Sequence, residues 1–202
     1  MHSYFSSKHQ PYISARYTIF VAEVASTVNE VLLINYLLQQ AKDRNTRKFL
    51  LNSFIDQCRG TFFTQVMFAE FEKITHEKAA AGEPLNAQVF NSIYGSLFKE
   101  YYGDSVVCDE EVQYNWARIP HFYRPFYVYK YATGFASAIA IAEQLLLGNE
   151  EAQEKYLQFL KSGSSDYPLE LLKKTGVDLT TSATIESALT YFGKLIDAFE
   201  QA

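Results

Sequence analysis

Length, composition and charge already exclude several classes of protein. The chain has 202 residues, of which 48% are hydrophobic and 20% charged, and this balance excludes an intrinsically disordered protein. The formal net charge of -5 argues against binding that depends on phosphate neutralisation, so we expect no nucleic-acid partner. Aromatic residues make up 16% and include 15 tyrosines, whose hydroxyls need hydrogen-bond partners where they are buried.

Helical periodicity dominates the first half of the chain. From about Tyr17 to Ala41 the sequence contains no Gly or Pro, and a segment of this length favours a helix over a strand. A second long helix is expected over about residues 46–80, loosened at Gly60. Gly82-Glu83-Pro84 is a typical signal for the end of that helix.

The second half is expected to be helical as well, with Asn86 and Asn149 as suitable N-cap residues. Residues 105–120 form a mixed segment that contains Cys108, three acidic residues and the only tryptophan, Trp116. The remaining expected helices run over about 87–102, from after Pro125 to Leu147, over about 150–161, 168–176 and 182–200. We therefore predict an all-α protein that forms a single helical domain over residues 1–202.

No targeting segment is recognisable in the sequence. Met1-His2-Ser3-Tyr4 is not a basic region followed by an apolar core, and Phe135–Ala142 is too short to cross a bilayer. Cys58 and Cys108 lie in unrelated sequence contexts, so neither a disulfide framework nor a thiolate metal site is indicated. A cytoplasmic protein without a membrane partner is the expectation.

One face of the first long helix carries two carboxylates. Glu23, Ser26, Thr27 and Glu30 have the i, i+3, i+4, i+7 spacing that places side chains on one face. Most of the remaining circumference is apolar, as in a buried helix, and buried carboxylates need a cation, a metal or hydrogen bonds. Two interpretations remain open: a functional pair of carboxylates, or a polar strip that faces solvent.

A second cluster of candidate residues lies between Ile119 and Tyr131, where one histidine and four tyrosines occur. His121 and the tyrosines are able to donate hydrogen bonds to an oxygen that gains negative charge. Pro120 and Pro125 stiffen the backbone on either side of the histidine. Taken by itself, the cluster is more often an aromatic core patch whose hydroxyls face water.

Other catalytic motifs are absent from these residues. His76-Glu77 is the only His-Glu pair, and Ala80 stands where the second histidine of an H-E-x-x-H helix would be. The sequence also contains no G-x-G-x-x-G, no phosphate-binding loop and no G-x-S-x-G.

Four segments, in order along the chain, resemble oligoendopeptidase F, a family of thimet-oligopeptidase-like zinc peptidases. Met1–Ser7 resembles the stretch that directly follows H-E-L-G-H-S in that family. Phe20–Glu30 is similar to the segment with the third zinc ligand, and Ile119–Gly134 to the substrate-binding His/Tyr segment. Pro168–Lys173 resembles the late signature of the family. The resemblance implies the helical catalytic-domain portion of such a metallopeptidase, beginning just after H-E-x-x-H.

The resemblance also implies roles for single residues. Glu23 matches the glutamate that completes the zinc site. Glu30 matches a second glutamate of the family, which orients a ligand of that site. His121 and Tyr129 match the histidine and tyrosine that contact the scissile carbonyl and its oxyanion. Tyr127 is an alternative to Tyr129, because the spacing from the histidine differs from that of thimet-type relatives.

The zinc-binding histidines and the general base are not among these 202 residues. We therefore expect the complete enzyme to be a zinc endopeptidase that hydrolyses short peptides. By itself, this chain of 202 residues is expected to be inactive and not to hold zinc tightly. Its expected partners are peptide substrates, the N-terminal part of the peptidase and, through exposed apolar surface, further copies of itself. The alternative is a non-catalytic helical module that binds peptides.

Overall fold

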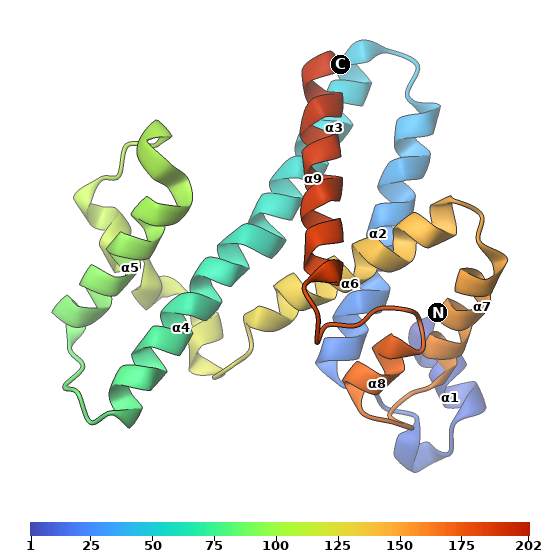
Figure 1. Cartoon of the computed structure of the whole chain (residues 1–202), viewed down its shortest axis with the longest axis horizontal. Coiled ribbons are helices and arrows are strands. Elements are labelled where there is room, and N and C mark those ends of the chain that lie inside the picture. Colours follow the sequence, from blue (N-terminus) through green and yellow to red (C-terminus); the bar gives the residue numbers. More distant parts are fainter. The chain divides into compact units, whose positions relative to one another are not determined.

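The structure is a computed structural model that describes all 202 residues, and its regular elements are helices without any strand, which confirms the all-α prediction. The chain divides into two compact units. Unit 1 comprises Met1–Arg59 and Thr133–Ala202, and unit 2 comprises Gly60–Ala132 (Figure 1). This division into compact units does not test the expectation that residues 1–202 form a single domain, which stays a prediction.

Unit 1 is a bundle of helices drawn from both ends of the chain. Its α1 packs on α7, and its α3 packs on both α2 and α9. The helices are α1 (His2–His9), α2 (Ile19–Gln40), α3 (Arg44–Cys58), the larger part of α6 (Tyr129–Leu146), α7 (Glu150–Lys161), α8 (Pro168–Lys173) and α9 (Ala183–Gln201). α1 was not among the predicted helices, because its eight residues show no apolar periodicity.

The core of unit 1 forms around α2. Val21, Val24 and Val28 recur with helical spacing on one face of α2 and are at most 1% exposed. They pack with aliphatic side chains of α6, α7 and α8, including Leu171 and Leu172. By length and composition α2 could also cross a membrane, but a core helix meets the same criteria, and its buried valines form this core.

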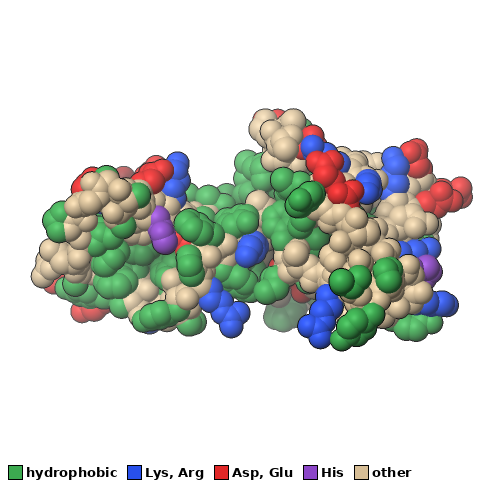
Figure 2. Space-filling view, turned by 90° about the horizontal axis from the view of Figure 1, so that it is seen from below, with side chains coloured by type: hydrophobic (Ala, Val, Ile, Leu, Met, Phe, Trp, Pro, Cys, Tyr) green, Lys and Arg blue, Asp and Glu red, His purple; other side chains and the backbone are tan.

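Unit 2 is built on two antiparallel helices, α4 (Thr64–Ala80) and α5 (Ala87–Tyr102), followed by 3₁₀ turns (Figure 1). The 3₁₀ helix Glu110–Arg118 packs along α5, and a further turn covers Pro120–Tyr123. Large aromatic side chains dominate its core. In the space-filling view, apolar side chains also reach the surface of this unit, at the left (Figure 2).

Local rules predicted two helix N-termini correctly. The side-chain oxygen of Asn86 accepts from Val89 N at 3.0 Å, and that of Asn149 accepts from Ala152 N at 3.1 Å. The long helix predicted over 46–80 is interrupted by a π-helical segment at Arg59–Phe63, in agreement with the loosening expected at Gly60.

The helix expected directly after Pro125 begins later, at Tyr129. Phe126 has a φ of 57°, the left-handed region, and a residue in that conformation does not continue a helix.

Candidate functional site

The first candidate group belongs to unit 1, where α2 presents Glu23. Its side chain is half-buried and has no hydrogen-bond or ion-pair partner. Burial raises the pKa of this carboxyl, and the negative charge of Glu30 raises it further. Gly134 lies directly opposite on α6: a Cβ built there would stand 3.2 Å from the Cβ of Glu23. The glycine therefore allows α6 to approach α2 closely beside this carboxylate.

The remainder of the polar face of α2 is not uniformly buried. Thr27 is 7% exposed, whereas Ser26 and Glu30 are exposed to solvent. Gln57 of α3 donates a hydrogen bond to a carboxylate oxygen of Glu30. Of the two interpretations left open by the sequence, the solvent-facing strip describes Glu30, whereas Glu23 is half-buried.

The donor set for a metal is incomplete within this chain. A catalytic zinc site needs three protein ligands, and no group of three His, Cys, Asp or Glu side chains is placed to hold a metal ion. Glu23 has the chemistry of one such ligand, an unpaired carboxylate in a half-buried position. These residues therefore fit part of a zinc site and do not complete one.

The second candidate group belongs to unit 2 and brings three side chains together. The rings of His121 and Tyr127 stack with their centroids 5.6 Å apart at an interplanar angle of 4°. The hydroxyls of Tyr127 and Tyr131 lie 3.1 Å apart, and the Tyr131 hydroxyl lies 3.4 Å from His121 Nε2. We call these three residues the His/Tyr array. It presents two hydroxyls and one imidazole, all potential hydrogen-bond donors, in one place.

The array depends on a buried contact made by α4. Glu72 is only 5% exposed, and its Oε1 accepts a hydrogen bond from Phe126 N at 2.7 Å. The ring of His76, one turn later on α4, lies 4.8 Å from the ring of Phe126. Both contacts are made by Phe126, whose backbone is in the left-handed region, and the next residue, Tyr127, stacks on His121.

The other predicted tyrosine, Tyr129, is the first residue of α6 and is 40% exposed. The Nζ of Lys130 lies 5.9 Å from its ring centroid and 5.5 Å from that of Tyr127. The structure thus stacks Tyr127 on His121, and Lys130 lies near the rings of both Tyr127 and Tyr129. The choice between the two tyrosines as the oxyanion contact stays a prediction.

Sequence reasoning missed two residues of this region. Tyr131 received no role, although it lies only four residues after Tyr127 in the same aromatic segment. Glu72 carried no such signal, because nothing in the local sequence distinguishes it from its exposed neighbours on α4.

Comparisons with known proteins agree with these observations. A model of peptidase family M3 matches residues 1–191. Oligopeptidase PepF of Bacillus subtilis is 48% identical to this chain over 201 residues, which are 100% of this chain and 30% of the relative. The plasmid-encoded oligoendopeptidase F of Lactococcus lactis subsp. cremoris is 47% identical over 201 residues, again 100% of this chain and 33% of the relative.

A solved structure gives the same result. The crystal structure of oligoendopeptidase-F from Enterococcus faecium superimposes with a TM-score of 0.89 at 42% identity, over 99% of this chain and 37% of that one. The chain therefore spans about a third of the length of the relatives that it matches. Because the family match covers almost every residue, the predicted resemblance is confirmed, and the chain belongs to peptidase family M3.

Proposed function

We propose that this chain is the part of a zinc endopeptidase that supplies the third metal ligand and the groups that bind the substrate carbonyl. The relatives are named as oligopeptidases and oligoendopeptidases, which supports short peptides as the substrate class. Members of the family are generally metal-dependent. The single observation that carries the proposal is Glu23, a half-buried carboxylate without a partner among these residues.

The groups of this chain have separate roles in the proposed reaction. Glu23 supplies one negatively charged oxygen ligand. A zinc ion, when bound in the complete enzyme, makes a water molecule more acidic and polarises the peptide carbonyl. His121 and Tyr127, or Tyr129 in place of Tyr127, donate hydrogen bonds to the carbonyl oxygen as it gains negative charge.

The 202 residues are proposed to be inactive alone, because they contain one zinc ligand and no general base in an H-E-x-x-H helix. Apolar side chains on α2 and α3, including Leu33 at 57% and Phe49 at 71% exposure, are proposed to contact the remainder of the peptidase. Without that partner, the same surface should lead to self-association, which sedimentation at increasing concentration measures.

The test uses the complete protein, extended upstream through H-E-x-x-H. Glu23→Ala should lose both bound zinc and hydrolysis of a short fluorogenic peptide, whereas Glu154→Ala, an exposed glutamate on α7, should change neither. Tyr127→Phe should retain zinc but lower kcat by about 100- to 1,000-fold if its hydroxyl stabilises the oxyanion. Tyr129→Phe, measured beside it, identifies which tyrosine has that role.

The outcomes separate the proposal from its alternative. Normal zinc content and normal hydrolysis in the Glu23→Ala variant would contradict the metal assignment. A complete protein that binds peptides and never hydrolyses them would favour the non-catalytic binding module.

A further inference from the structure

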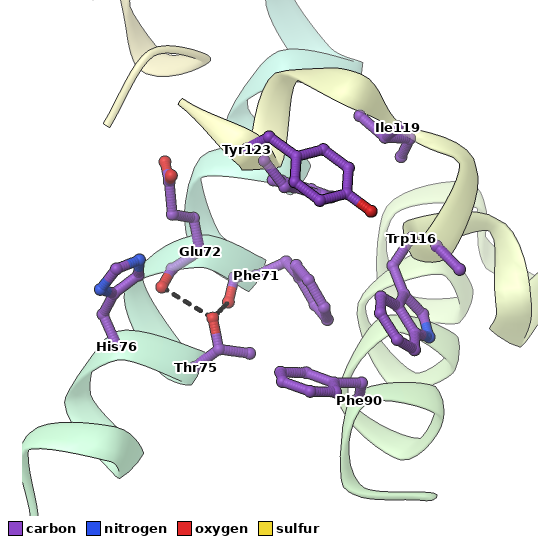
Figure 3. Close-up of a pocket in the computed structure, with 10 residues that line it drawn as sticks. Phe71, Glu72, Thr75, His76, Phe90, Trp116, Ile119 and Tyr123 are labelled. Atoms are coloured by element: carbon purple, nitrogen blue, oxygen red, sulfur yellow. Dashed lines mark hydrogen bonds between the residues drawn. The ribbon is translucent and has the colours of Figure 1, made fainter. Parts of the chain in front are cut away.

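A pocket in unit 2 is enclosed by the aromatic core and reaches the surface. Its volume is about 230 Å³, and exposed side chains, Tyr123 at 85% and His76, lie at its rim (Figure 3). Six apolar or aromatic residues form most of the wall: Phe71, Phe90, Trp116, Ile119, Phe122 and Tyr123. Apolar cavities of about 150 Å³ already accommodate benzene, so there is room for one large apolar side chain.

The buried polar side chains around this pocket are already engaged elsewhere, whereas His76 and Tyr123 are exposed at its rim. Trp116 Nε1 donates to Asn91 Oδ1 at 2.8 Å, which leaves the apolar faces of the indole for the pocket. The Thr75 hydroxyl donates to two carbonyls of its own helix at 2.9 Å each, and its methyl group points toward the aromatic rings (Figure 3). The carboxylate of Glu72 accepts from Phe126 N. The buried part of the pocket therefore favours an apolar ligand group, because a polar one would lose its hydration there.

The chain connects this pocket directly to the His/Tyr array. His121, Phe122 and Tyr123 belong to one 3₁₀ turn, Pro120–Tyr123, in which the first side chain joins the array and the next two line the pocket. Neighbouring residues of one turn are a few ångströms apart, which is the spacing of successive groups on an extended peptide.

We propose that this pocket binds a large apolar side chain, aromatic or branched aliphatic, of a peptide whose backbone lies along the Pro120–Tyr123 turn. The inference rests on the proposed function for one point, that the ligand is a peptide. Five aromatic rings in the wall favour an aromatic occupant, since aromatic pairs gain more than the area that they bury.

The protein contains its own reporter for this site. Trp116 is the only tryptophan in the chain and is half-buried in the wall of the pocket, so a change in its fluorescence reports on the environment of that wall. The probes are N-acetyl-phenylalanine amide, N-acetyl-leucine amide and N-acetyl-glycine amide, which share a peptide-like backbone and differ in the side chain. The first two should give a saturable change at millimolar concentration, and the third none.

Two pairs of variants locate the binding. Phe90→Ala removes part of the wall and should weaken binding of the phenylalanine probe about tenfold, whereas Phe98→Ala, on the same helix and outside the pocket, should change it less than about twofold. Because Phe90 also packs on the core, Tyr123→Ala provides a variant at an exposed position. Its control is Tyr114→Ala, a 52% exposed tyrosine that does not line the pocket. Isothermal titration calorimetry measures all four affinities without dependence on the indole.

The results that overturn the inference are distinct from those that overturn the proposed function. An equal response to the glycine and phenylalanine probes, or no response to either, would exclude a side-chain pocket, even in a complete protein that hydrolyses peptides. So would equal affinities in Tyr123→Ala and Tyr114→Ala. A selective Trp116 response together with a complete protein that never hydrolyses peptides would support the pocket and contradict the peptidase assignment.

Discussion

Unit 1 is packed largely from aliphatic side chains, whereas unit 2 is packed largely from aromatic ones. In unit 1, Val24 and Val28 of α2 are 0% exposed, and Ala138 of α6 is equally buried in the same core. In unit 2, rings such as Phe71 and Tyr94 meet edge to face, 5.6 Å apart. Small aliphatic side chains let helices approach closely, while rings separate the backbones that carry them.

The difference shows how the two candidate sites are made. Close approach at Gly134 partly covers Glu23 and leaves its carboxylate without a partner. The rings of unit 2 leave a pocket between them and present the His/Tyr array from a short irregular segment. In unit 1, tight packing thus raises the pKa of one carboxyl group, that of Glu23. In unit 2, aromatic side chains form a pocket and a group of hydrogen-bond donors.

The largest expected difference between the units is the reactivity of their two cysteines. Cys58 in unit 1 is 1% exposed, and burial raises the pKa of its thiol to about 12, whereas Cys108 in unit 2 is exposed. At pH 8 the Cys58 thiol is therefore protonated, and the thiolate is the reactive form. A thiol reagent should therefore label one equivalent rapidly in the native chain, and the second only after denaturation.

Matched variants identify the two thiols. Cys108→Ser should abolish the rapid phase, and Cys58→Ser should leave it unchanged. The ordinary pKa of this thiol is 9.0, so the buried group lowers the free energy of unfolding only as the pH rises above about 9, toward 12. Rapid labelling of both cysteines in the native chain would mean that unit 1 is not tightly packed.

The next largest effect concerns the aliphatic core itself. Leu172 of α8 is 0% exposed, so Leu172→Ala should lower the free energy of unfolding by about 2–5 kcal/mol through lost burial and the cavity that remains. Leu169 belongs to the same helix and is 42% exposed, so Leu169→Ala should cost less than about 0.5 kcal/mol. Urea denaturation followed by circular dichroism measures both, and equal costs would contradict the assignment of Leu172 to the core.

Features that depend on local chemistry could be predicted from the sequence. Asn86 and Asn149 were recognisable as caps because a short polar side chain before a helix has one main use, and both make the expected bond. The start of α6 was not predictable, because Phe126 adopts a positive φ that a non-glycine residue rarely takes without outside support. That support comes from α4, 54 residues earlier in the chain.

In the candidate site, too, features that depend on one segment were predictable, and features that depend on packing between segments were not. Tyr127 and Tyr131 are four residues apart in one segment, so the sequence could have grouped them, although Tyr127 precedes the first residue of α6. Whether Glu30 is buried depends on which helices pack beside α2, and the repeat of apolar residues on α2 does not contain that information. The pocket around Trp116 likewise results from three segments that meet, and no one of them predicts it.

The smallest of these effects tests whether Glu72 stabilises the segment that leads to the array. Glu72→Ala should lower the free energy of unfolding by about 1–2 kcal/mol, because Phe126 N loses its hydrogen-bond acceptor. Phe126 is 54% exposed, so water can reach its backbone N–H and reduce this cost. Glu72→Gln keeps an acceptor oxygen and should cost less than Glu72→Ala.

Urea denaturation followed by Trp116 fluorescence measures both variants, because this indole lies in the same unit. The control is Glu77→Ala on the same helix, which removes only a solvent-exposed ion pair with Lys73 and should have almost no effect. If Glu72→Ala and Glu77→Ala unfolded at the same urea concentration, the left-handed conformation of Phe126 would have to be held by the packing of its ring on His76 instead. Unit 2 would then position the array by aromatic contacts alone.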